Sequence, residues 1–420
     1  MFFLYQILII ILLIFSPLII FFRILKKKED KKRYKEKFCF PSKKRINGNL
    51  IWFHGSSVGE LLSILPLVQE LEKNKSINQI LVTTSTLSSA QIFKKFSFKK
   101  TIHQFFPIDS ILFSYKFLNY WKPTIAIFVE SEIWPSIFRA LNKKNIPLKL
   151  LNARITKKTF NKWRRVKKFS NSVFQNISIA YPQNEETLNY LKKLNVKKIK
   201  KIGNLKFFNN QQSKLTKLDN TFLKNINLKK IWCASSTHPG EEIICADVHI
   251  NLKKKYKNLL TIIIPRHIHR VNKIVNEIKS LDLNIVLHSS RPKKLNNTDI
   301  YLVDTYGETQ KFYHSSDIVF MGKSISGKGG QNPLEPTNLG STVLYGPNVD
   351  NFKDTYKLLN KLKVAYKVNG VKSLTQSIDK LITKPNNKKN YLKIAKMGKK
   401  ILNETKDEIN SLFNNEIKKT

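Results

Sequence analysis

The sequence is poor in cysteine, in acidic residues and in arginine. Its three Cys share no C-x-x-C spacing, so neither a disulfide framework nor a structural zinc site is indicated. Asp and Glu total 29 against 75 Lys and Arg, which leaves a formal net charge of +46. Only 10 of those cations are Arg. Because Arg is the residue that reads phosphates and base edges through a planar fork, its scarcity argues against specific nucleic-acid binding.

Long apolar runs are also scarce, with one exception. Residues 1–22 are almost wholly apolar, and a helix of that length spans about 33 Å, enough for a hydrocarbon core of ~30 Å. Basic residues follow from Arg23 on and none precedes, which disfavours a cleaved signal peptide. We therefore expect a transmembrane anchor over 1–25 and a basic juxtamembrane segment over 26–48. The positive-inside rule predicts a single pass, with the body of the chain in the cytoplasm.

The body alternates short apolar runs with longer amphipathic ones, which is the pattern of βαβ units with parallel sheets. The first series of expected strands is 50–53, 80–83, 124–129, 147–151 and 178–181, and the second is 231–234, 259–264, 284–287, 300–303, 317–321 and 342–345. We expect an α/β fold of two Rossmann-like, doubly wound domains that face a cleft. The domains would occupy 49–206 and 231–385, with a polar linker at 207–230 and a helical tail at 386–420.

Ligands of open α/β sheets bind outside the carboxyl ends of the strands, and the unusual residues of this chain gather there. The first strand is followed by a loop that ends in Ser57-Val58-Gly59-Glu60. The spacing of Ser57 and Glu60 predicts a capping box at the start of a helix. It also allows a second interpretation, in which Glu60 is a general base beside glycines that let a substrate approach.

Charged residues follow three further strands of the first series. Glu130 and Glu132 come directly after five apolar residues, and two carboxylates spaced by two point to opposite sides if the strand continues. Arg154 and Lys206 lie in two later loops, and Gly203 before Lys206 allows a sharp turn. A solvated surface or a binding site would explain these residues equally.

The second series has similar loops. Residues 235–242 carry the hydroxyl, proline and acidic residues of a helix start, which is also an anion site. Arg266 follows the next strand and is a phosphate candidate. His267-x-His269 has the spacing of a metal pair, but no Asp, Glu or Cys clusters with it in the sequence, so no metal is expected.

A glycine-rich stretch follows the strand at 317–321. Residues 322–328 fit G-x-x-x-x-G-K, but Gly329 stands where a P-loop has the Mg²⁺-binding Ser or Thr, so a nucleoside triphosphatase is disfavoured. Residues 329–336 then form a flexible loop that two prolines restrict. Backbone amides beside its glycines are expected to cradle a phosphate, and Glu335 is expected to accept hydrogen bonds from ribose hydroxyls. Taken together, the loops predict a nucleotide-sugar site.

Eight of these segments resemble the motifs of the bacterial 3-deoxy-D-manno-octulosonic acid (Kdo) transferase family: 54–60, 130–135, 152–154, 203–207, 236–242, 265–270, 304–308 and 329–336. The resemblance extends over essentially the whole chain. It implies a GT-B fold and an inverting glycosyltransferase of lipopolysaccharide biosynthesis at the bacterial inner membrane. It further implies transfer of Kdo from CMP-Kdo to the lipid A precursor lipid IVA, without a cofactor or metal.

The resemblance also implies residue roles. Glu60 corresponds to the catalytic base, and Glu130 and Lys206 correspond to transition-state stabilisers. The implied CMP contacts are Pro265, Arg266, Tyr306, Gly307, Glu308, Asn332, Pro333, Leu334 and Glu335. The chain departs from the family pattern at Gln331, where His is usual, at Lys323, where Gly is usual, and at Tyr306, where Met is usual.

Two alternatives stay open at this point. One is a GT-B transferase that uses a UDP-sugar on another cell-envelope acceptor. The other is a membrane-tethered nucleic-acid-binding protein that uses the basic surface, although no nucleic-acid partner is expected from the low Arg content.

Overall fold

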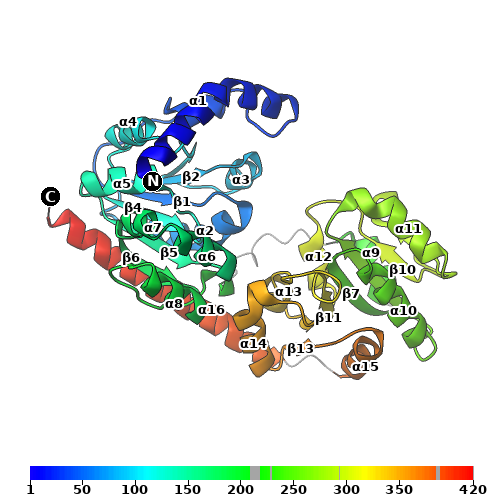
Figure 1. Ribbon diagram of the computed structural model, residues 1–420. Helices are drawn as coiled ribbons and strands as arrows, with labels where there is room; N and C mark the ends of the chain where they lie inside the picture. The colour runs from blue at the N-terminus through cyan, green and yellow to red at the C-terminus, as the bar shows by residue number, and fades with distance from the viewer. Residues whose placement is uncertain (209–217, 228, 293, 385–387, 420) are drawn as a thin grey trace. The chain divides into compact units, whose positions relative to one another are not determined.

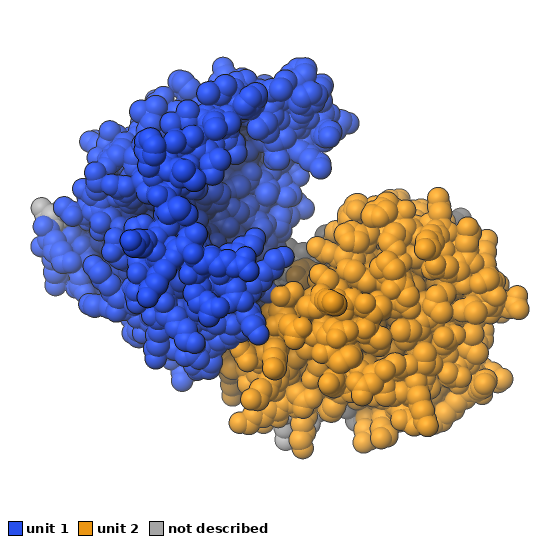
Figure 2. All heavy atoms as spheres, in the orientation of Figure 1, with its two compact units in different colours: residues 1–208, 398–420 blue, residues 209–397 orange. Residues whose placement is uncertain are grey.

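The computed structural model describes residues 1–208, 218–227, 229–292, 294–384 and 388–419. The chain divides into two compact units (Figure 2). Unit 1 comprises residues 1–208 and 398–420, and unit 2 comprises residues 209–397. Each unit is built on its own parallel sheet with helices between successive strands (Figure 1).

Unit 1 contains six parallel strands in the order β3-β2-β1-β4-β5-β6. Every residue of the four inner strands is buried, which explains their nearly continuous apolar sequence. Trp52 and Phe128 fill the core between the sheet and its helices. The strands are β1 Leu50–His54, β2 Gln79–Thr84, β3 Thr101–Phe105, β4 Ile125–Val129, β5 Leu148–Ala153 and β6 Ile177–Pro182.

The helices of unit 1 include two long ones, the first and the last helix of the chain. They are α1 Phe2–Leu25, α2 Val58–Leu71, α3 Leu87–Phe93, α4 Ile111–Trp121, α5 Pro135–Lys143, α6 Lys157–Arg165, α7 Lys167–Phe174, α8 Glu185–Lys193 and, from residue 398 on, α16 Lys388–Ile417. The end of α16 packs on this unit through buried Ile409 and Phe413 and through a hydrogen bond of 2.9 Å from the Tyr181 hydroxyl to Glu408.

Unit 2 contains seven parallel strands in the order β13-β12-β11-β7-β8-β10-β9. The strands are β7 Lys230–Thr237, β8 Leu259–Pro265, β9 Ile285–Leu287, β10 Ile300–Leu302, β11 Ile318–Met321, β12 Thr342–Tyr345 and β13 Ala365–Lys367. The helices are α9 Asn220–Asn227, α10 Glu241–Lys253, α11 Val271–Lys279, α12 Thr309–His314, α13 Leu334–Asn338, α14 Lys353–Lys361 and α15 Val371–Ile382.

The expected α/β fold with two doubly wound sheets is confirmed, and each expected strand is present. Two edge strands, β3 and β13, were missed by the sequence analysis. Within the range expected to be a linker, residues 209–217 and 228 lie outside the described residues. Helix α9 occupies Asn220–Asn227 of that range and buries Phe222 and Ile226.

Both sheets reverse their direction of winding at their centre. In unit 1 the chain runs from β1 outward to β2 and β3, then returns to β4 beside β1 and runs outward to β5 and β6. In unit 2 the corresponding pair is β7 and β11. The loops that follow these central strands therefore diverge, which leaves room for a ligand at the carboxyl edge of each sheet.

A buried carboxylate organises the loop after β11. Glu241, the first residue of α10, is fully buried. Its Oε2 accepts from the backbone N–H of His238 at 2.9 Å and of Lys323 at 2.7 Å, and its Oε1 accepts from Ser324 at 2.9 Å and Ile325 at 3.0 Å. These four amides have their partner inside the protein, which ties the start of α10 to the loop after β11.

We predict that Glu241→Ala destabilises the protein by at least about 3 kcal/mol, because each buried amide left without an acceptor costs ~1–3 kcal/mol. Glu241→Gln keeps one acceptor oxygen, so its free energy of unfolding should lie between those of Glu241→Ala and the parent. Chemical denaturation measures the free energy of unfolding. The matched control is Glu277→Ala on α11, whose carboxylate makes only an exposed ion pair with Lys273 and should cost less than ~0.5 kcal/mol. Equal losses in Glu241→Ala and the control would contradict this account.

Candidate active site

Glu60 lies in the first turn of α2, at the carboxyl edge of the unit 1 sheet. The predicted capping box is confirmed: the Glu60 N–H donates to Ser57 Oγ at 3.3 Å, and the Ser57 N–H donates to Glu60 Oε2 at 3.1 Å. Capping engages one carboxylate oxygen, so it orients Glu60 without using its whole side chain. The structural and the chemical interpretation of Glu60 are therefore compatible.

Glu130 and Glu132 extend from the end of β4 to different partners. Glu130 adopts φ +57°, a left-handed conformation that is unusual for a non-glycine residue and ends the strand. Its carboxylate pairs with Lys206 Nζ at 2.5 Å. Glu132 instead accepts from Ser56 Oγ at 2.5 Å and from the indole N–H of Trp134 at 2.8 Å. The two carboxylates thus diverge, although the strand does not continue.

Lys206 is held by the two asparagines on its side of the site. Asn204 Oδ1 accepts from the Lys206 N–H at 2.9 Å, and Asn152 Oδ1 accepts from the N–H of Leu205 at 3.2 Å. Gly203 makes the turn before them at φ +139°, where an added Cβ would lie 2.8 Å from the side chain of Ile401. The predicted turn at Gly203 therefore positions Lys206, whose side chain is 21% exposed while that of Glu130 is 5% exposed.

The pKa values of Glu60 and Glu132, two carboxylates at this edge of the sheet, are shifted in opposite directions. Burial raises the pKa of Glu60 to about 7, and the charges of Glu132 and Glu130 add to that rise against an opposing hydrogen bond from Ser57. Burial also raises the pKa of Glu132, but hydrogen bonds from His54, Ser56 and Trp134 outweigh it and hold that pKa below its usual range. Glu132 thus stays ionised, whereas burial and the charge of Glu132 leave Glu60 only partly ionised at neutral pH, a difference typical of an acid–base pair.

His54 supports this arrangement from the end of β1. It is fully buried and its ring stacks on Phe106 with centroids 3.8 Å apart. Burial lowers the pKa of His54, so the imidazole is neutral near pH 7. Its Nε2 lies 3.0 Å from Glu132, and its Nδ1 lies 3.0 Å from the Thr83 hydroxyl and 3.2 Å from the Thr83 carbonyl. Because a carboxylate can only accept, we assign the proton of the neutral ring to Nε2.

The supporting roles of His54, Ser56, Glu132 and Trp134 were not predicted from the sequence. All four lie in the two loops that the motifs had identified, so their positions were a signal. The role of Glu132 depends on the left-handed turn at Glu130, and nothing in the sequence announces that turn because a non-glycine residue makes it.

The residues expected to contact CMP lie at the carboxyl edge of the unit 2 sheet. Pro265 ends β8 and is buried, whereas Arg266 is exposed and anchored by its N–H, which donates to Thr237 at 3.1 Å. Tyr306 and Gly307 form an exposed turn after β10, with φ +85° at the glycine.

Glu308 stands at the same edge, between two cationic or hydrogen-bonding partners. It pairs with the imidazole of His288 and with Lys311 at 2.9 Å. Burial raises its pKa, but the hydrogen bonds from Lys311 and His288 outweigh this and hold the pKa of Glu308 below its usual range. Glu308 is therefore an acceptor at neutral pH.

The loop before α13 carries the remaining expected contacts. Asn332 Oδ1 accepts from the Leu334 N–H at 3.2 Å, Pro333 and Leu334 are buried, and Glu335 is exposed at the start of α13. The preceding residues 323–325 donate their backbone N–H groups to Glu241, so a phosphate cradle would have to use the amides of 329–336, where it was expected.

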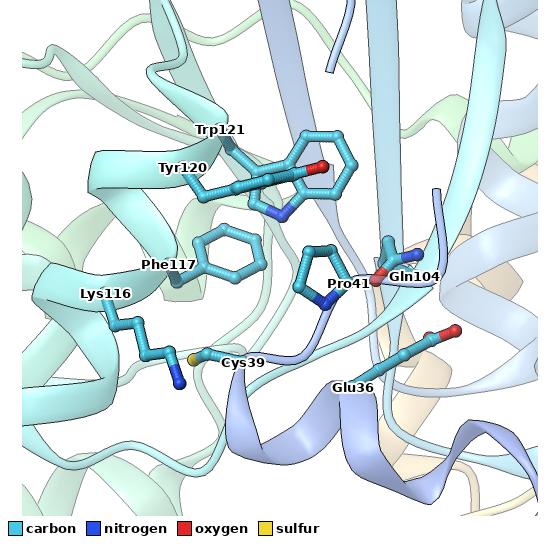
Figure 3. Close-up of a pocket in the computed structure, with 8 residues that line it drawn as sticks. All are labelled: Glu36, Cys39, Pro41, Gln104, Lys116, Phe117, Tyr120 and Trp121. Atoms are coloured by element: carbon cyan, nitrogen blue, oxygen red, sulfur yellow. The ribbon is translucent and has the colours of Figure 1, made fainter. Parts of the chain in front are cut away.

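A pocket in unit 1 shares no residue with the carboxyl edge of its sheet, where Glu60 and Glu132 lie. Figure 3 shows its lining: Glu36, Cys39, Pro41, Gln104, Lys116, Phe117, Tyr120 and Trp121. The Glu36 carboxylate in it already accepts from Arg33 at 2.7 Å and from the backbone N–H of Phe105 at 2.7 Å. Among the described residues, no group of three or more His, Cys, Asp or Glu is placed to hold a metal ion.

Comparison with known proteins identifies the family of this chain. Residues 32–209 match the family model described as 3-deoxy-D-manno-octulosonic-acid transferase (kdotransferase). A 3-deoxy-D-manno-octulosonic acid transferase of Rickettsia bellii is 34% identical over 393 residues, which cover 91% of this chain and 92% of the relative. The transferase of Haemophilus influenzae is 29% identical over 372 residues, covering 86% and 85%.

Solved structures give the fold. A glycosyltransferase from Rickettsia africae has a TM-score of 0.57 at 13% identity and covers 89% of this chain and 100% of its own. A UDP-GlcNAc 2-epimerase from Neisseria meningitidis bound to UDP-GlcNAc has a TM-score of 0.57 at 15% identity, covering 85% and 99%. The two α/β units are thus of the GT-B type. Since its relatives match over nearly their full length, the chain belongs to the Kdo transferase family, the glycosyltransferases that transfer Kdo in lipopolysaccharide synthesis.

Proposed function

We propose that this protein moves Kdo from CMP-Kdo to lipid IVA with inversion at the anomeric carbon, and that Glu60 is the general base. The observation that carries the proposal is the environment of Glu60: a capped, half-buried carboxylate with a pKa of about 7, beside an ionised Glu132. A base is most effective when its pKa lies near the working pH.

In the proposed reaction Glu60 removes the proton from an acceptor hydroxyl while the oxygen attacks the anomeric carbon of Kdo. The bond from that carbon to the phosphate oxygen breaks through an oxocarbenium-like state, and CMP leaves with the electron pair. Lys206 supplies fixed positive charge near the developing anion. Glu130 holds Lys206 in place by their ion pair and adds negative charge that favours an oxocarbenium-like sugar.

Unit 2 would hold the donor. Arg266 is placed to pair with the single phosphate of CMP. The ionised carboxylate of Glu308 and the exposed carboxylate of Glu335 can accept hydrogen bonds from ribose hydroxyls. The other proposed contacts, Pro265, Tyr306, Gly307, Asn332, Pro333 and Leu334, shape the same edge.

We also propose that the protein works at the cytoplasmic face of the bacterial inner membrane. Helix α1 is long and apolar enough to associate with a membrane. The acceptor, a bisphosphorylated lipid, is anionic, which suits a chain of net charge +46. The basic segment 26–48 adds attraction to anionic headgroups.

Replacing Glu60 by Gln should lower the rate of transfer at least ~100-fold, because a positioned general base contributes about 10²–10⁴. The Gln keeps the capping acceptor, so the rise in melting temperature caused by CMP should stay as in the parent. Transfer is measured with enzymatically generated CMP-Kdo and lipid IVA, and the product mass counts the Kdo units added. The control is Glu70→Gln on the same helix, where the carboxylate pairs with exposed Lys73. If UDP raised the melting temperature and CMP did not, the donor assignment would fail, whatever the variants did.

The pH profile should reveal the ionisation of Glu60. Transfer needs the carboxylate, so kcat/KM should fall about tenfold per pH unit below about 7 and level off above it. Glu132→Gln removes a charge that raises the pKa of Glu60 and should move this limb to lower pH. An unchanged limb in Glu132→Gln would contradict the assigned electrostatics.

The raised pKa of Glu60 also predicts how the stability of the folded protein changes with pH. Because the pKa of Glu60 in the folded protein lies above its usual value near 4.5, the folded state binds more protons between about pH 4.5 and 7. The contribution of Glu60 to stability is therefore present at low pH and is lost as the pH rises to about 7. Glu60→Gln should melt at a higher temperature than the parent at pH 8, and this gain should vanish near pH 4.

Lys206→Met should abolish transfer and lower the free energy of unfolding by about 3 kcal/mol, because breaking a buried ion pair leaves Glu130 uncompensated. The double variant Glu130→Gln with Lys206→Met should regain most of the stability and none of the activity. Denaturation and the transfer assay separate the two effects. Recovery of transfer in the double variant would remove Lys206 from the chemistry.

A further inference from the structure

Helix α1 rests on unit 1 along one side only. The residues that unit 1 covers at least partly recur every three or four positions along the whole helix, the helical spacing of one face: Phe2, Tyr5, Gln6, Ile9, Leu13, Ser16, Ile20, Arg23 and Ile24. The remaining surface consists of large apolar side chains that stay exposed, among them Leu4, Ile11 and Leu18. The helix therefore has a protein-facing side and an uncovered apolar side.

The first turns of α1 are fixed to unit 1 by polar contacts. The Tyr5 hydroxyl donates to Asp109 at 2.6 Å. The Gln6 side chain donates to Ser136 at 2.8 Å and accepts from the Ile111 N–H at 3.2 Å. These contacts satisfy the two polar side chains that interrupt the start of the apolar run, and both would lack partners in hydrocarbon.

Asp109 links this attachment to the frame of unit 1. It is buried, and besides Tyr5 it accepts from the N–H groups of Ser136 at 3.0 Å and Ile137 at 2.9 Å. It therefore caps α5, the helix that begins directly after the loop of Glu130 and Glu132. The start of α1 is thus joined to the carboxyl edge of the sheet.

The other end of α1 is fixed as well. Arg23 in its last turn pairs at 3.0 Å with Glu29, a buried carboxylate that also pairs with Lys37 at 2.6 Å. Ser16 and Ile20, one to two turns earlier, are buried. Both ends of a helix about 36 Å long are thus attached to one folded unit.

Positive charge borders both ends. Residues 26–28 follow the helix as three consecutive Lys. At the start of α1, Tyr5 contacts Phe169 of α7, with ring centroids 5.9 Å apart. Phe169 directly follows the segment 157–168, which carries seven Lys or Arg. A helix that crosses a bilayer as the positive-inside rule describes has its cations concentrated at the cytoplasmic end, so basic residues near both ends of α1 differ from that pattern.

We propose that α1 lies in the plane of the cytoplasmic leaflet and does not cross the membrane. Its uncovered apolar side enters the acyl chains, and the basic residues at both ends contact anionic headgroups. This replaces the single pass expected from the length of the apolar run. A single pass would place the first turns of α1 on the far side of the bilayer from Asp109 and Ser136 and break the contacts of Tyr5 and Gln6.

The arrangement has a consequence that rests on the proposed function. Because α1 attaches through Asp109 and α5, the carboxyl edge that carries Glu60 lies next to the leaflet. Leu112, in the turn whose Ile111 N–H binds Gln6, is 69% exposed and extends the apolar surface at that edge. A lipid acceptor can then present its headgroup to Glu60 while its acyl chains stay in the membrane.

Cross-linking in native membranes tests the attachment. Gln6→Cys with Ser136→Cys should be joined within the full chain by a bismaleimide that spans ~8 Å, and so should Phe2→Cys with Arg139→Cys, since Arg139 stacks over Phe2 at 4.4 Å. The control pair is Leu8→Cys with Ser136→Cys, because Leu8 points away from unit 1. The native Cys39, Cys233 and Cys245 are buried and give little background. Cross-links that form in detergent but in neither pair in membranes would overturn the proposal.

Depth measurements test the orientation independently of activity. Leu4→Cys, Ile11→Cys and Leu18→Cys, spaced by seven residues on the uncovered side, carry a fluorophore in vesicles of phosphatidylethanolamine and phosphatidylglycerol. Quenching by lipids spin-labelled at shallow and deep positions should place all three at one similar, shallow depth. A deep Ile11 between shallower Leu4 and Leu18 would establish a crossing helix, and no quenching at any site would refute membrane insertion; either result overturns the proposal. Neither outcome depends on the donor or acceptor.

Discussion

The site depends on one electrostatic constraint: Glu60 must share a partly buried edge with a carboxylate that cannot be protonated at neutral pH. Glu132 is kept ionised by three hydrogen-bond donors, and burial, with a further contribution from the charge of Glu132, raises the pKa of Glu60 to about 7. The three donors are neutral His54, Ser56 and Trp134, and their hydrogen bonds stabilise the charge of Glu132. The capping box fixes the backbone of α2, so the carboxylate of Glu60 is oriented before any substrate arrives.

The partners of each carboxylate also decide the role of Glu130, the other acidic residue at the end of β4. Glu130 and Glu132 are two residues apart, yet a left-handed residue at the end of β4 separates them into different tasks. Glu130 neutralises and places Lys206, whereas Glu132 acts on Glu60. In unit 2 a carboxylate again organises backbone, because Glu241 occupies amides that would otherwise resemble an anion site. Most of the net charge of +46 lies outside these networks, and the part that borders α1 is the part with a structural assignment.

Much of the fold follows from the sequence, because buried parallel strands leave continuous apolar runs that are easy to recognise. Strand β3 was missed because Thr101–Phe105 mixes polar and apolar residues at the sheet edge, and β13 because only Ala365 of its three residues is buried. The capping box at Ser57 and Glu60 was readable from spacing alone. Two features were not readable: the occupation of residues 323–325 by Glu241, which is 82 or more positions away, and the attachment of α1, which only Tyr5 and Gln6 hinted at.

The proposed chemistry depends on the ionisation of Glu60, which can be observed directly. Carbon-13 NMR of the full chain labelled at the glutamate carboxyl carbon, with the Glu60 resonance identified by its loss in Glu60→Gln, follows its titration. We predict a midpoint near pH 7 in the parent, displaced to lower pH in Glu132→Gln. A midpoint near 4.5 in both proteins would contradict the role assigned to Glu60 and to the carboxylate beside it.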